Sequence, residues 1–198
     1  MLARSAREFV TGRSSLRRVR QLRDANDADG FSRDLWREMA ALGWLGITIP
    51  EALGGAGLGW MDQMVVLEQM GRGLMPEPFT STVLLGTTAL LLGGSDAQKK
   101  EHLPKIAVGE RLLAVAYQET GSRYDATKVA TKAVKSGAGF TITGEKIQVL
   151  DGHVADFLVV SVRTAGAAAD ASGITLFLIA ADTPGITIER QSRIDSRN

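Results

Sequence analysis

The stretch from Leu112 to Gly152 carries the residue types best suited to hold a ligand. An apolar run, Leu112 to Tyr117, is followed by the polar loop Gln118 to Asp125, which contains Gly121, hydroxyl groups and carboxylates. A strand that ends in such a loop can turn several backbone N–H groups toward one ligand, because glycine removes the side chain that would block a close approach. The loop therefore predicts a site for a phosphate or a flat ring.

A second segment of this stretch alternates apolar and polar residues on both sides of Gly144. Alternation from Phe140 to Val149 predicts a β-hairpin that turns at this glycine, with Glu145 and Lys146 in the turn. On composition alone, a half-buried hairpin without a ligand is the simpler interpretation.

Taken together, the two segments resemble an acyl-CoA dehydrogenase. In that family a T-E-P-x-A-G-S-D loop follows a strand, and an N-G-x-K-x-W-I-T-N-G hairpin comes later in the chain. This chain has Q-E-T-G-S-R-Y-D at 118–125 and T-G-E-K-I-Q-V-L-D-G at 143–152, and upstream it has L-G-W-L-G-I-T-I-P-E-A-L-G-G at 42–55. The resemblance covers nearly the whole chain and is closest to a bacterial branch that includes the small subunit of pimeloyl-CoA dehydrogenase.

The resemblance implies an FAD-dependent enzyme that desaturates an acyl-CoA thioester, with hydride transfer from Cβ to flavin N5. Both segments wrap the flavin in the family, so the expected cofactor-binding residues are Tyr117, Gln118, Glu119, Thr120, Gly121, Ser122, Tyr124, Gln148, Val149 and Leu150. The expected substrate-binding residues are Gly86, Thr87, Tyr124 and Asp125. The family's catalytic base lies in a C-terminal helical domain that is missing here, so no catalytic residue is assigned.

Four positions depart from the family pattern. Gln118 replaces a flavin-contacting threonine, Tyr124 a serine near the cofactor phosphates, Gln148 a tryptophan, and Leu150 a threonine at the flavin N5 edge. These changes support an alternative, a non-catalytic acyl-CoA- or FAD-binding subunit or remnant that needs a partner chain to supply the base. A third possibility is a piece of an ordinary enzyme.

Neither loop carboxylate is a good candidate for that base. The family places this loop against the cofactor phosphates and CoA and away from the substrate α-carbon. Glu119 and Asp125 are therefore interpreted as structural, loop-capping groups.

The hydrophobic period predicts an α+β fold with two domains. Residues 1–110 are expected to form an α-helical bundle, and residues 111–198 a small antiparallel β-barrel or sandwich. The expected strands are Leu112 to Tyr117, Val129 to Val134, Phe140 to Thr143, Lys146 to Leu150, Phe157 to Val162, Ile174 to Ala180 and Ile186 to Arg190.

Helical periodicity and capping residues locate the expected helices. Met1 to Arg23 is interpreted as a folded helix in preference to a targeting signal. A further helix is expected after an N-cap at Ser32, with Leu35, Met39 and Leu42 on one face. Helices are also expected over Trp60 to Arg72, mostly buried, and over Phe79 to Leu92. A last helix is expected after a capping box at Ser95 to Gln98, with His102 exposed.

Composition limits the possible partners. The 23 basic and 22 acidic residues give a net charge of +1, so nucleic acid is not an expected partner. The chain has no cysteine, and its two histidines, His102 and His153, lie in no metal-ligand pattern. No apolar run reaches the roughly 20 residues needed to cross a bilayer, so a soluble, cytoplasmic bacterial protein is expected, with the mitochondrial matrix as the alternative. By resemblance, the partners are acyl-CoA, an identical or related subunit, and electron-transfer flavoprotein as electron acceptor.

Overall fold

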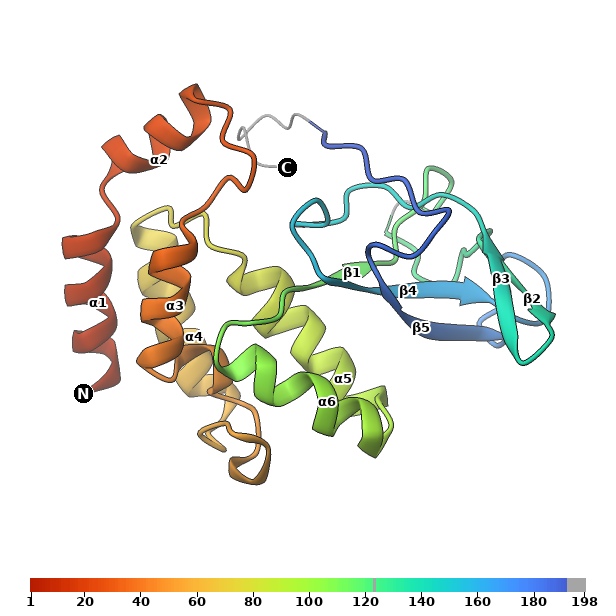
Figure 1. Ribbon diagram of the computed structural model, residues 1–198, viewed down its shortest axis with the longest axis horizontal. Helices are drawn as coiled ribbons and strands as arrows, with labels where there is room; N and C mark the ends of the chain where they lie inside the picture. Colours follow the sequence, from red (N-terminus) through yellow and green to blue (C-terminus); the bar gives the residue numbers. More distant parts are fainter. Residues whose placement is uncertain (123, 192–198) are drawn as a thin grey trace. The chain divides into compact units, whose positions relative to one another are not determined.

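The computed structural model describes residues 1–122 and 124–191 and has the expected α+β class (Figure 1). Contacts divide these residues into two compact units, a helical unit of residues 1–112 and a β unit of residues 113–191. Among the described residues, no helix is long and apolar enough to cross a membrane.

Six α-helices form most of the helical unit: α1 (Leu2–Arg13), α2 (Leu16–Asp24), α3 (Arg33–Ala41), α4 (Trp60–Arg72), α5 (Thr87–Gly93) and α6 (Asp96–Ala107). Two 3-10 turns, η1 (Trp44–Gly46) and η2 (Glu51–Leu53), and a π-helical segment, η3 (Phe79–Gly86), connect them. Trp44 packs in the core as expected: it is 2% exposed, and its ring meets Phe9 edge-on with centroids 5.0 Å apart.

Side-chain caps set several helix starts. The Ser32 hydroxyl accepts a hydrogen bond from Leu35 N (3.3 Å), and Ser95 and Gln98 form the expected reciprocal capping box. The prediction of one helix over Met1 to Arg23 is wrong, because Ser15 caps a separate helix by accepting from Arg18 N. A capping serine satisfies a backbone donor that would otherwise have no partner, so a new helix begins there.

Three expectations for the helical unit are corrected. Helix α4 is not mostly buried, since Met61 and Met64 are 74% and 59% exposed. Phe79 to Leu92 begins as a π-helix before becoming α-helical. His102 was expected to be exposed but is only 3% exposed, because it faces inward beside the buried Leu103. Its Nδ1 lies 2.6 Å from the Arg111 guanidinium.

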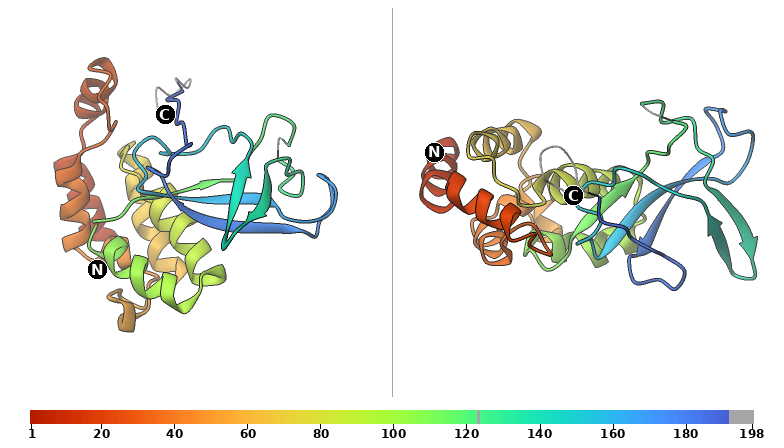
Figure 2. Two further views of the ribbon diagram at one scale, coloured as in Figure 1. Left: turned by 45° about the vertical axis from the view of Figure 1, so that its right-hand side comes forward. Right: turned by 90° about the horizontal axis from the view of Figure 1, so that it is seen from above.

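The β unit contains one mixed sheet of β1 (Leu113–Ala116), β2 (Lys132–Ser136), β3 (Gly139–Thr143), β4 (Phe157–Arg163) and β5 (Ile174–Ala180). Strand β4 lies between β1 and β5 (Figures 1 and 2). Residues 157–160 of β4 pair in parallel with β1, and all of β4 pairs antiparallel with β5. At its last residue, Arg163, β4 also pairs in parallel with Lys132 of β2. The expected antiparallel arrangement is therefore wrong for β1 and for the contact with β2.

The expected hairpin around Gly144 is also wrong. The hairpin is formed by β2 and β3, which pair from Lys132↔Thr143 to Ser136↔Gly139, so the turn comes at Gly137, where φ is 59°. Glycine adopts such a positive φ without strain, which favours the turn at this position. Residues 146–150 and 186–190 are irregular and form no strand.

Candidate functional site

The loop from Gln118 to Asp125 follows β1 and is held by its own polar groups. The Ser122 hydroxyl accepts from Glu119 N (2.9 Å), and Ser122 N donates to Glu119 O (3.0 Å). The Asp125 carboxylate accepts from the hydroxyl and the N–H of Thr127 (2.6 and 3.0 Å), which lowers its pKa. Ser122 and Asp125 therefore use their side chains to fix the shape of the loop.

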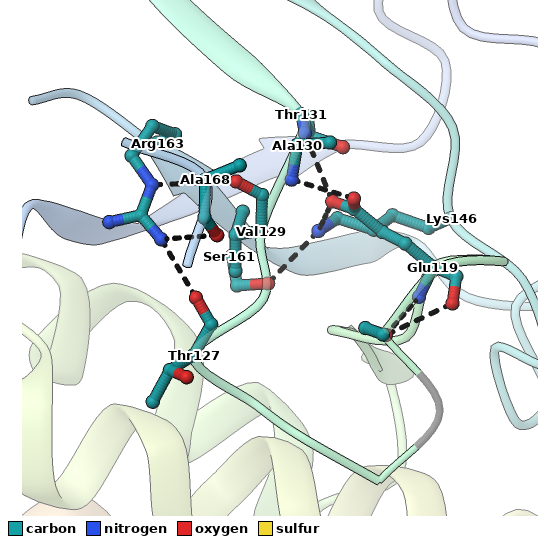
Figure 3. Close-up of polar contacts among 10 residues, drawn as sticks. Glu119, Thr127, Val129, Ala130, Thr131, Lys146, Ser161, Arg163 and Ala168 are labelled. Atoms are coloured by element: carbon teal, nitrogen blue, oxygen red, sulfur yellow. Dashed lines mark hydrogen bonds and ion pairs between the residues drawn. The ribbon is translucent and has the colours of Figure 1, made fainter. Parts of the chain in front are cut away.

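The Glu119 carboxylate turns into the protein and is surrounded by donors (Figure 3). The residue is 7% exposed. Its oxygens accept from Ala130 N (2.7 Å), Thr131 N (3.1 Å) and the Lys146 ammonium (2.6 Å), and Lys146 also donates to the Ser161 hydroxyl (3.0 Å). Lys146 is thus a buried partner of the loop, whereas the sequence placed it in a hairpin turn.

This pair has a defined charge state. Burial alone would raise the pKa of Glu119, but the hydrogen bonds from Lys146 and from the N–H groups of Ala130 and Thr131 lower the pKa to about 2. Burial lowers the pKa of Lys146, and Glu119 opposes that change. Glu119 is therefore a fully hydrogen-bonded carboxylate at neutral pH, which agrees with a structural role.

The segment Lys146 to Leu150 lies directly against this loop. Ile147 N donates to Gln118 O over 2.9 Å, one residue from each member of the Glu119–Lys146 pair. Gln148 has φ 52°, a left-handed conformation that is uncommon for residues other than glycine and that interrupts any strand here. The two segments identified from the sequence are thus side by side, although the second does not form the hairpin expected around Gly144.

Backbone donors remain available on both segments. Within residues 1–122 and 124–191, the N–H groups of Thr120, Gly121, Gln148, Val149 and Leu150 donate no hydrogen bond. Thr120 and Gly121 are exposed, and a Cβ added to Gly121 would meet no atom within 4 Å. Uncommitted donors beside an open glycine can bind the acceptor atoms of a ring or a phosphate.

The other expected site residues are placed as follows. Tyr124 is 95% exposed, and Tyr117 is 40% exposed with its hydroxyl accepting from Gln118 Nε2 (3.0 Å). Gly86 and Thr87 belong to the helical unit and are buried, and the Thr87 hydroxyl donates to Thr82 O (3.0 Å). The Thr87 hydroxyl is therefore already bonded within its own helical segment.

Arg163, at the end of β4, was missed by the sequence analysis. It is 4% exposed, and its guanidinium donates to the carbonyl oxygens of Thr127, Val129, Ala168, Asp170 and Ser172. Arg163 thereby holds residues 127–129 against the connection between β4 and β5. A lone arginine that closes an apolar strand was the available signal, because a buried guanidinium requires several acceptors.

Family profiles match almost the whole chain. The acyl-CoA dehydrogenase N-terminal domain matches residues 1–110, and the acyl-CoA dehydrogenase middle domain matches residues 114–196. Isovaleryl-CoA dehydrogenase of Pongo abelii is 34% identical over 80% of this chain and 38% of its own length. Benzylmalonyl-CoA dehydrogenase of Aromatoleum aromaticum is 34% identical over 84% of this chain and 44% of its own length.

Solved structures show the same relationship. The ChsE4-ChsE5 complex of Mycobacterium tuberculosis is 30% identical with a TM-score of 0.83, over 96% of this chain and 49% of that chain. An acyl-CoA dehydrogenase of Bacillus anthracis complexed with FAD is 27% identical with a TM-score of 0.83, over 98% of this chain and 33% of that one. The chain thus spans half or less of these proteins. With both domain profiles matched in order, this chain belongs to the acyl-CoA dehydrogenase family.

Proposed function

We propose that this chain is the flavin-binding part of an acyl-CoA dehydrogenase that desaturates an acyl-CoA thioester between Cα and Cβ. The observation that carries the proposal is the contact between residues 118–121 and 146–150, which leaves five backbone donors free beside the open position at Gly121. FAD has acceptor atoms on its ring and its phosphates, and when bound it accepts the hydride that leaves Cβ.

The residues of the two segments suit this cofactor. The N–H groups of Thr120, Gly121 and Gln148 to Leu150 would donate to it, and Gly121 would allow its close approach. The Glu119 charge is neutralised by Lys146, so it would not repel the cofactor phosphates. The relative from B. anthracis, whose structure contains FAD, supports the same assignment.

Substrate and electron acceptor are part of the same proposal. Acyl-CoA is the proposed substrate, with the exposed Tyr124 and the loop residue Asp125 as candidate contacts and the segment at Gly86 and Thr87 as a candidate wall of the acyl site. Electron-transfer flavoprotein is the proposed acceptor. Glu119 is not the proposed base, because it is buried in an ion pair; the resemblance places the base in a C-terminal helical domain.

A flavin titration of the purified 198-residue chain tests the proposal. FAD fluorescence and visible absorption are followed with and without a long-chain acyl-CoA, and saturable one-to-one binding is expected. Gly121→Ala should weaken binding by about tenfold, because its methyl group would project beside the free donors. Gly139→Ala is the matched control, since it also adds a methyl group in open space but lies on β3. A folded chain that binds no FAD would refute the proposal.

A second candidate is a binding subunit that works only with a partner chain. The two carboxylates of the loop favour it, since Glu119 is paired with Lys146 and Asp125 is hydrogen-bonded to Thr127. Co-purification with a second acyl-CoA dehydrogenase-like chain, together with desaturation only in the complex, would support this candidate. Activity that appears when the same polypeptide is extended by its own downstream coding sequence would exclude it.

A further inference from the structure

One buried ion pair lies at the junction of the two segments that carry the free backbone donors. The side chains of Glu119 and Lys146 are 9% and 8% exposed, and they meet at 2.6 Å. Glu119 immediately precedes Thr120 and Gly121, and Lys146 immediately precedes residues 147–150. Figure 3 shows the two side chains approaching each other across this junction.

The pair joins further parts of the β unit. Glu119 also binds the N–H groups of Ala130 and Thr131, and Lys146 binds Ser161 on the central strand β4. The two side chains therefore connect four parts of the β unit. These are the loop at Glu119, the residues 130–131 that precede β2, the segment that begins at Lys146, and strand β4 at Ser161. A displacement of either segment would have to break these bonds.

Overall stability is a weak explanation for such a pair. Removing two charges from water costs free energy that their attraction often fails to recover, and an apolar pair of similar volume can stabilise a fold equally well. What an ion pair adds is direction, because its hydrogen bonds are satisfied in only one arrangement of the two segments. In this chain that arrangement sets the spacing between two groups of free donors.

We propose that Glu119 and Lys146 are positioning residues that hold the two donor segments at the spacing required for ligand binding, an inference that rests on the proposed function above. They act through the backbone of their neighbours and do not touch the ligand. The bond from Ile147 N to Gln118 O is a direct reporter of the spacing, because it joins the same two segments.

The test uses the 198-residue chain and the variants Lys146→Met and Glu119→Gln. Lys146→Met keeps the length of the stem and removes the charge, whereas Glu119→Gln keeps an acceptor for Ala130 or Thr131. Lys128→Met is the matched control, because Lys128 is exposed and its ion pair with Asp125 is 3.8 Å long.

Two readouts are measured, amide hydrogen exchange without ligand and the Kd for FAD. In both variants, exchange of the Ile147 amide should rise about tenfold more than exchange of the β4 amides, and FAD binding should weaken by about tenfold. Lys128→Met should change neither.

Unchanged exchange at Ile147 would overturn the inference. Equal loss of protection throughout the β unit in both variants would also overturn it, because the pair would then serve general stability. If the unsubstituted chain binds no FAD, the proposed function fails, but the exchange readout still decides whether the pair sets the spacing.

Discussion

The buried Glu119 carboxylate predicts a specific dependence of stability on pH. Its pKa is lowered from an ordinary value of 4.5 to about 2, although burial alone would raise it, because Lys146 and two backbone N–H groups donate to it. A group whose pKa is lower in the folded state stabilises that state above its unfolded pKa, and the contribution is lost as the pH falls toward the folded pKa. The contribution should therefore be complete above about pH 5 and should decline between pH 4.5 and pH 2.

The magnitude follows from the same two values. Each pKa unit corresponds to about 1.4 kcal/mol, so the Glu119 contribution to the free energy of unfolding is about 3 kcal/mol at neutral pH. The comparison is with Glu119→Gln, which cannot ionise at this position. At pH 7 the variant should be less stable by about 2 to 3 kcal/mol, and the difference should shrink steadily below pH 4.5.

Urea denaturation followed by circular dichroism at pH 7, 5, 4 and 3 measures this difference. Other acidic residues titrate in the same range, but they do so in both proteins and cancel in the comparison. Asp24→Asn provides a control, because Asp24 belongs to an exposed surface ion pair, which contributes little to the free energy of unfolding. A gap between the parent and Glu119→Gln that stays constant from pH 7 to pH 3 would refute the reasoning.

Three further predictions concern single side chains. Gly144→Ala should lower the free energy of unfolding by about 2 kcal/mol or more, because its Cβ would lie 2.4 Å from Thr131 Oγ1 and 2.7 Å from Thr131 Cα, whereas Gly121→Ala should leave stability unchanged in the same urea titration. Arg163→Met should lower the free energy of unfolding by about 3 kcal/mol, since several carbonyl groups lose a buried charged donor. Faster proteolysis between Thr164 and Gly173 would show that this connection has been released from Arg163. Unchanged proteolysis would contradict the role assigned to Arg163. Burial lowers the pKa of His102, so its contribution to stability should be present above about pH 6.5 and decline below it. The Tm of the helices is measured at pH 7.5 and pH 5.5. The fall in Tm between these two pH values should be smaller in His102→Gln than in the parent.

Features set by neighbouring residues were predictable from the sequence. The N-cap at Ser32, the capping box at Ser95 and the limits of α4 and β5 all follow from local signals and agree with the structure. Residues 118–125 and 146–150 were also singled out, because glycine and small polar residues after an apolar strand form a local pattern, and the structure places these two segments side by side. Hydrogen bonds between residues three or four positions apart need no information from distant parts of the chain.

What the sequence left open depends on residues that are far apart along the chain. The parallel pairing of β1 with β4 joins residues 113–116 to residues 157–160, and no local pattern distinguishes it from an antiparallel pair. The burial of the Glu119 side chain depends on Lys146. The burial of Arg163 depends on carbonyl groups from two segments, one before β2 at Thr127 and one between β4 and β5 at Ser172. Charged side chains are expected at the surface unless partners are brought to them. Only the tertiary structure supplied those partners, and with them it decided which residues of the site hold the loop and which remain free to bind.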